Sequence, residues 1–140
     1  MQSPTRALQE KGLKATPQRV ELYTALLSTK AHPSVETLYK TVKEVLPTIS
    51  LNTVYTTLCA FEDAGLARRI DAGDGLRYDG NSTPHSHIVC NSCHRVEDLA
   101  AQVDTNTIDL LHQVATASGY LAQDYAVYFF GICPVCQKEI

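Results

Sequence analysis

The sequence predicts an α+β fold, with a helical first half followed by a mixed α/β second half. Apolar residues recur at helical spacing in four segments before residue 65. Two short apolar runs around a glycine-rich turn come next, and a pair of Cys-x-x-Cys motifs then brackets the second half. A chain of 140 residues that is 44% hydrophobic and 19% charged can bury a core as one domain or two small ones.

Four helices are predicted in the first half from their caps and stop signals. They run from Ser3 to the stop at Gly12, from Thr16 to about Lys30, from Pro33 to the stop at Pro47, and from Ser50 to the stop at Gly65. Thr16 followed by Pro17 is typical of a helix start. The apolar residues of each segment fall on one face, which we expect to form a shared core.

A β-hairpin is predicted directly after the helices. Residues 66–70 and 76–78 form the two strands, and residues 72–75 form the glycine-rich turn between them. Helices followed by a strand pair make the order of a winged helix, a helix-turn-helix with a hairpin appended. We therefore predict a winged-helix domain over residues 1–80 and a hinge over residues 81–84.

The second domain is predicted to cover residues 85–140. Residues 88–90 and 95–99 read as strands around the first Cys-x-x-Cys turn, and Asp104 is expected to cap a helix. Residues 126–132 are expected to form a buried strand that leads into the last Cys-x-x-Cys motif. This second domain contains no glycine motif that could cradle a phosphate.

Four cysteines are predicted to hold one structural zinc ion: Cys90, Cys93, Cys133 and Cys136. Each Cys-x-x-Cys turn points two thiolates to one side, and two such turns complete a closed tetrahedral site. Free thiols are one alternative. A redox motif is another, but neither pair opens a helix of a βαβ unit. The fifth cysteine, Cys59, is expected to be a small core residue.

A second, less specific set of candidate metal ligands offers nitrogen and oxygen donors. It consists of His32, Asp79, His85, His87 and Asp98. Such a set suits iron(II), manganese(II), or zinc with five or six ligands. His85 and His87 would point to the same side of an extended segment, as chelation requires. Each residue also has an ordinary explanation in a turn or at a strand end, so spacing alone leaves the shared site open.

Charge and composition limit which partners and which cellular compartment we expect for this protein. Residues 1–80 carry ten Lys/Arg against nine Asp/Glu, whereas residues 81–140 carry two against six. The first half is therefore the better candidate for nucleic acid. No apolar run is long enough to cross a bilayer, and the N-terminus does not resemble an export signal. We expect a cytoplasmic protein with no membrane partner, whose cysteines stay reduced.

Several segments in this order resemble the ferric uptake regulator (Fur) family of bacterial metal-dependent repressors. They are residues 14–19 (KATPQR), 31–34 (AHPS), 53–55 (TVY), 85–87 (HSH), 90–93 (CNSC) and 131–136 (GICPVC). The resemblance implies a winged-helix DNA-binding domain and an α/β dimerisation domain. It also implies a homodimer on a palindromic operator in double-stranded DNA, and a regulator rather than an enzyme.

Within the family, the chain most resembles the peroxide-sensing branch. Three histidines and two aspartates hold the regulatory ion there, and they correspond to His32, Asp79, His85, His87 and Asp98. Iron-sensing members usually have glutamate at the two aspartate positions. One departure is that Thr56 and Thr57 follow Tyr55, where some peroxide sensors have an asparagine pair.

The resemblance also implies a mechanism. Bound iron(II) or manganese(II) sets the DNA-binding geometry, and peroxide oxidises His32 or His85 of the iron form, which releases DNA. The expected DNA contacts are Arg19, Asn52, Thr53, Tyr55, Thr56, Arg69 and Arg77. Two alternatives stay open: an iron-, manganese- or zinc-responsive repressor without histidine oxidation, and a metal-dependent enzyme.

Overall fold

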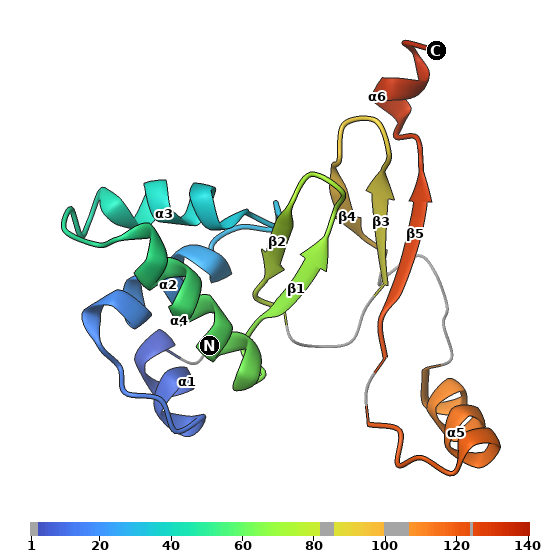
Figure 1. Cartoon of the computed structure of the whole chain (residues 1–140), viewed down its shortest axis with the longest axis horizontal. Helices are drawn as coiled ribbons and strands as arrows, with labels where there is room; N and C mark the ends of the chain where they lie inside the picture. The colour runs from blue at the N-terminus through green and yellow to red at the C-terminus, as the bar shows by residue number, and fades with distance from the viewer. Residues whose placement is uncertain (1–2, 82–85, 100–106, 124) are drawn as a thin grey trace. The chain divides into compact units, whose positions relative to one another are not determined.

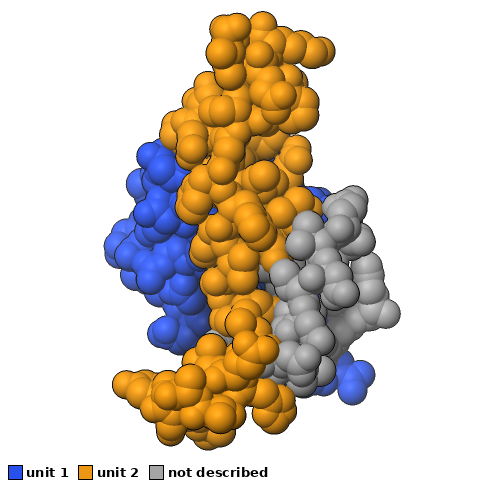
Figure 2. Space-filling model, turned by 90° about the vertical axis from the view of Figure 1, so that its right-hand side faces the viewer, with its two compact units in different colours: residues 1–82 blue, residues 83–140 orange. Residues whose placement is uncertain are grey.

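The computed structural model describes residues 3–81, 86–99, 107–123 and 125–140 (Figure 1). The chain divides into two compact units, residues 1–82 and residues 83–140, which Figure 2 shows in different colours. The predicted hinge over residues 81–84 falls mostly outside the described residues. The domain limits of 1–80 and 85–140 therefore stay a prediction.

Four helices build most of the first unit, as predicted. They are α1 (Pro4–Glu10), α2 (Pro17–Leu27), α3 (Val35–Lys43) and α4 (Leu51–Asp63). Each is capped by a hydroxyl side chain, from Ser3, Thr16, Ser34 and Ser50, which accepts a hydrogen bond from the backbone N–H three residues later. Gly65 ends the last helix with a φ of 77°, a conformation that favours glycine.

The core of the first unit lies where these helices meet. Leu22, Val54, Leu58 and Phe61 are completely buried there. The ring of Phe61 meets the ring of Tyr23 edge to face, with centroids 5.5 Å apart. Apolar burial at this scale is the main term that holds the helices together.

A β-hairpin follows α4 and completes the winged helix. Strands β1 (Arg68–Asp71) and β2 (Leu76–Asp79) pair antiparallel, with Ile70 opposite Arg77. Gly73 and Gly75 in the turn have positive φ values of 90° and 125°, which a residue with a Cβ rarely adopts. The predicted order of helices and hairpin is confirmed.

The second unit is built on a three-stranded sheet in the order β4-β3-β5. Its central strand β3 (Ser86–Cys90) pairs antiparallel with β4 (Val96–Asp98) and parallel with β5 (Val127–Gly131). Helix α5 (Thr107–Ser118) lies in the crossover between β4 and β5, and a short helix α6 (Pro134–Gln137) follows the sheet. Helix α6 was not predicted, and the expected cap Asp104 lies outside the described residues.

The expectation of a buried last strand is wrong for this chain taken alone. Strand β5 is an edge strand, and Phe129 and Phe130 are 42% and 62% exposed. An apolar run reports a preference for burial but not what covers it, and in the described part of the second unit neither of these two side chains is covered. None of the described helices is long and apolar enough to cross a membrane.

Replacing Phe61 by alanine should destabilise the protein strongly. The ring is completely buried, so the change removes apolar contacts and leaves a cavity, at a cost of about 3–5 kcal/mol. The free energy of unfolding from urea titrations measures the effect. Val45→Ala is the control, because Val45 is 59% exposed, and it should change the free energy by no more than about 0.5 kcal/mol. Equal effects of the two changes would contradict the described core.

Candidate metal centres

The four cysteines of the two Cys-x-x-Cys motifs come together in the second unit. Cys90 ends β3, and Cys93 follows in the turn to β4. Cys133 is the N-cap of α6, and Cys136 lies within that helix. Their sulfur atoms all lie within 4.8 Å of one another, and the sulfurs of Cys93 and Cys133 are 3.8 Å apart. Thiolates bound tetrahedrally at about 2.3 Å from zinc are about 3.8 Å apart, so the cluster fits a zinc ion.

Backbone amides also direct the cluster toward the thiolate form. The N–H groups of Cys93 and Cys133 donate to the Cys90 sulfur over 3.5 and 3.4 Å, and they lower the pKa of Cys90 to about 6. The N–H of Cys136 lowers the pKa of Cys133 in the same way. A hydrogen bond from Ser92 lowers the pKa of Cys136, but its neighbour Cys133 and burial outweigh this and raise it to about 12. Four thiols so close together share their charge unevenly, and a divalent cation relieves the repulsion between thiolates.

The first unit contributes a buried histidine–aspartate pair. His32 lies in the turn before α3 and Asp79 ends β2, and their exposed fractions are only 2% and 8%. The Nε2 atom of His32 is 3.4 Å from Oδ2 of Asp79, while Oδ1 of Asp79 accepts a hydrogen bond from the Asn81 amide over 2.9 Å. Two ligands of one ion with bonds of about 2.1 Å are separated by about 3 Å, so the spacing of this pair is close to that of two ligands of one ion.

The second unit contributes a second histidine–aspartate pair, in which the histidine is buried and the aspartate is exposed. His87 on β3 and Asp98 on β4 are direct cross-strand partners, with Nε2 and Oδ1 3.3 Å apart. The buried ring of His87 stacks on the ring of Tyr128, the residue opposite it on β5, with centroids 5.8 Å apart. His85, the fifth predicted ligand, lies outside the described residues.

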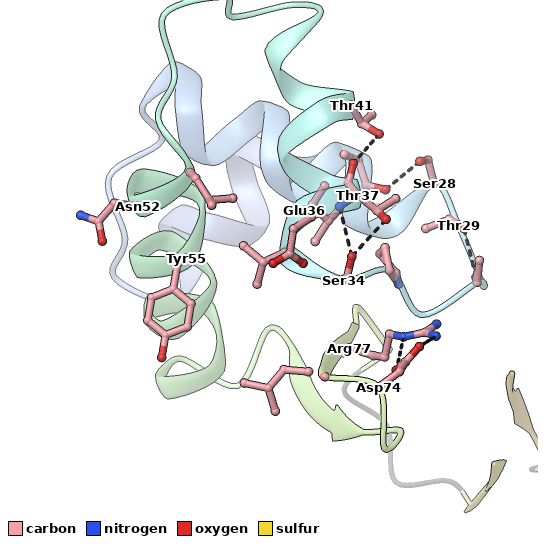
Figure 3. A pocket seen from close by; sticks show the side chains of 18 residues that line it. Ser28, Thr29, Ser34, Glu36, Thr37, Thr41, Asn52, Tyr55, Asp74 and Arg77 are labelled. Carbon is pink, nitrogen blue, oxygen red and sulfur yellow. Dashed lines mark hydrogen bonds and ion pairs between the residues drawn. The ribbon is translucent and has the colours of Figure 1, made fainter. Parts of the chain in front are cut away.

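The residues predicted to contact DNA are distributed over α2, α4 and the hairpin. Asn52, Tyr55 and Thr56 share an exposed face of α4, whereas Thr53 is half-buried. The ring of Tyr55 is 41% exposed, so it is not the core aromatic that the apolar spacing also allowed. Tyr55 and Asn52 border a groove of about 1010 Å³ between α3, α4 and the hairpin (Figure 3).

The three predicted arginines differ in their surroundings. Arg19 donates to the backbone carbonyl of Lys14 over 3.1 Å, and Arg69 pairs with Glu62 at 3.2 Å with 43% of its side chain exposed. Arg77 is bonded to Asp74 and only 20% of its side chain is exposed. Sequence reasoning missed Asp74 and Tyr128. No motif marks them: Asp74 meets Arg77 across the hairpin turn, and the contact of Tyr128 with His87 depends on strand register.

A hairpin-bearing winged helix, joined in one chain to a second unit with a four-cysteine cluster, defines a metal-binding regulator of the winged-helix class. Residues 10–130 match the ferric uptake regulator family, and the chain belongs to that family. Its members are metal-responsive transcriptional regulators and not enzymes, which confirms the expectation that this protein is not an enzyme.

Relatives with known names support this placement. The peroxide-responsive repressor PerR of Staphylococcus aureus (strain Mu50 / ATCC 700699) is 30% identical over 95% of this chain and 88% of its own length. The Campylobacter jejuni peroxide stress regulator matches with a TM-score of 0.74 and 30% identity over 91% of this chain and 93% of that one. The Pseudomonas aeruginosa ferric uptake regulator with manganese has a TM-score of 0.76 and 26% identity, over 95% and 99%.

Replacing Cys136 by serine should abolish tight zinc binding, because it removes one of the four sulfurs that converge on the cluster. Purified wild-type protein should contain one zinc ion per chain by elemental analysis, and the variant should lose it to a chelator. Cys59→Ser is the matched control, because Cys59 lies on α4 in the first unit, outside the cluster. If Cys136→Ser keeps its zinc against the same chelator, the four-sulfur site is wrong.

Proposed function

We propose that this protein is a metal-dependent DNA-binding repressor that senses peroxide by oxidation of a histidine ligand. The observation that carries the proposal is the pair of histidine–aspartate contacts, His32 with Asp79 and His87 with Asp98, in which both histidines are buried. Both carboxylates are aspartates, as in the peroxide-sensing branch of the family. Relatives named as peroxide-responsive repressors or regulators support the same branch.

The four cysteines serve a structural role in this proposal. A zinc ion held by Cys90, Cys93, Cys133 and Cys136 has no open position for substrate, so it ties β3 to α6 and takes no part in sensing. Thiolates persist in a reducing compartment, so the protein is proposed to act in the cytoplasm.

The regulatory ion is proposed to bind His32, Asp79, His85, His87 and Asp98. Three imidazoles and two carboxylates suit iron(II) or manganese(II) in the cell. An ion that takes ligands from both units would limit their relative motion and favour one DNA-binding geometry. The metal then acts as a corepressor.

Iron and manganese differ in what they do with hydrogen peroxide. Iron(II) held by these residues would activate hydrogen peroxide for oxygen transfer to a ligand, a chemistry that manganese(II) would not supply. A ring carbon of His32 or His85 would gain one oxygen atom and lose its hydrogen to the new hydroxyl or oxo group in a two-electron oxidation, and hydrogen peroxide would be reduced by those two electrons, its second oxygen leaving as water. The oxidised ring is a poorer ligand, so the ion and then the DNA are released.

The DNA partner is proposed to be a palindromic operator, bound by a homodimer. Regulators of this family bind DNA as dimers. Exposed apolar side chains on β5 and α5, among them Phe130 at 62% and Val114 at 46%, provide a surface for a second copy of the chain. A twofold axis would place one α4 in each half-site, with Arg19 and Arg69 as candidates for phosphate contacts.

Treating the iron-loaded protein with dilute hydrogen peroxide should add one oxygen atom to a peptide that contains His32 or His85. Peptide mass spectrometry measures the change. Manganese-loaded protein under the same treatment is the control and should stay unmodified. If the iron form also stays unmodified while still binding DNA, the protein is an iron-, manganese- or zinc-responsive repressor without oxidation.

Tyr55→Ala should weaken binding to the specific operator by about tenfold or more, because it removes an exposed aromatic from the reading face of α4. Fluorescence anisotropy with metal-loaded protein measures the affinity, which should fall as salt rises. Tyr120→Ala replaces a tyrosine that is 77% exposed in the second unit and should leave the affinity unchanged. Equal affinity of the wild type for palindromic promoter DNA and random DNA would exclude a specific repressor.

A further inference from the structure

Arg77 joins the tip of the hairpin to the turn that carries His32. From β2, its Nε and Nη2 atoms donate to the two carboxylate oxygens of Asp74 over 3.3 and 2.7 Å. Its Nη1 donates to the backbone carbonyl of His32 over 3.3 Å. Figure 3 shows the guanidinium directed at Asp74, on the side of the groove where Ser34 begins α3. One planar group therefore bridges two segments that are 45 residues apart in sequence.

The His32 turn requires such support. His32 has a φ of 54°, in the left-handed region that is costly for a residue with a Cβ, and its side chain is 2% exposed. The next residues run along β2: the Tyr78 amide donates to the Pro33 carbonyl over 2.9 Å, and Ser34 forms a bridge with Arg77. Both of these contacts with β2 are made by backbone atoms, whereas the carbonyl of His32 is held by the Arg77 side chain.

We propose that Arg77 is a positioning residue for the regulatory metal, which by bridging Asp74 to the His32 carbonyl holds the His32 imidazole ready to bind the ion. This inference deepens the proposed function and rests on it. Asp74 has two effects here, since it orients the guanidinium and neutralises a positive charge that would repel a cation. Hydrogen-bond partners that orient a metal ligand raise its affinity without touching the metal.

The environment of Arg77 separates this role from a phosphate contact. Its side chain is 20% exposed and is bonded on both sides, whereas Arg69 on the other strand of the hairpin is 43% exposed. A phosphate contact would need Arg77 to leave Asp74, to which it is bonded through two nitrogen atoms. The two roles make different predictions for manganese binding in the absence of DNA.

Arg77→Ala should raise the dissociation constant for Mn²⁺ by about tenfold or more, as expected when a partner that orients a ligand is lost. Zinc-loaded full-length protein is titrated with Mn²⁺ without DNA, and zinc content is measured alongside. Arg77→Lys should not restore the affinity, because an ammonium lacks the planar fork that bonds Asp74 and His32 together. Asp74→Asn should weaken Mn²⁺ binding in the same direction. Arg6→Ala removes a charge from an exposed pair on α1 and should bind Mn²⁺ like the wild type.

A second readout separates positioning from simple loss of structure. In metal-free protein, hydrogen exchange should speed up in the Arg77→Ala variant around residues 31–34, while zinc content and helix signal stay unchanged. At saturating Mn²⁺ its DNA affinity should return to the wild-type value. Wild-type Mn²⁺ affinity in Arg77→Ala or in Arg77→Lys overturns the inference, as does DNA binding that stays weak at saturating Mn²⁺. If Arg77→Ala does not fold, Arg77→Lys and Asp74→Asn decide. A wild-type protein that binds no Mn²⁺ refutes the proposed function instead.

Discussion

The second unit depends on the pairing of strand β3 with its two neighbours. Parallel pairing with β5 sets Cys90 opposite Gly131, so the second Cys-x-x-Cys motif starts beside the end of β3. The same strand sets His87 opposite Asp98 on one side and Tyr128 on the other. Since successive side chains of a strand point to opposite faces, His87 and Cys90, three positions apart, serve different faces. One register therefore positions a four-sulfur cluster and a histidine–aspartate pair without mixing their donors.

Local signals were sufficient to predict the first unit. Hydroxyl caps, helical spacing of apolar residues and a glycine turn are properties of short windows, and they located all four helices and the hairpin. The second unit was less predictable because its sheet joins segments far apart in sequence. The apolar run of residues 126–132 predicted the strand but also, wrongly, its burial. Edge position is decided by topology and by whether another chain covers the face, neither of which is encoded in the window.

The candidate sites show the same division. Cysteine spacing predicted which four sulfurs meet, because two residues between cysteines fix the geometry of a tight turn. The histidines and aspartates were predicted as ligands of one ion by the family resemblance. Their spacing left the question open, since nothing in it says that His32 reaches Asp79. The contact of Arg77 with the His32 carbonyl and the contact of Tyr128 with His87 depend on how distant segments meet, which leaves no motif.

The side chain of Asp79 is one methylene shorter than that of a glutamate, and this difference has a physical consequence. Asp79 accepts a hydrogen bond from the amide two residues later, at Asn81, a contact that the short side chains of Asp and Asn make readily. A glutamate would place its carboxylate one methylene further out and lose this local anchor. With Asp79 held by Asn81 and His32 held by Arg77, both donors of the first unit are ordered from β2 and from the second residue after it. Whatever fixes the hairpin then favours the proposed metal ligands, and, because coupling between sites is reciprocal, an ion bound by those ligands would fix the hairpin in return.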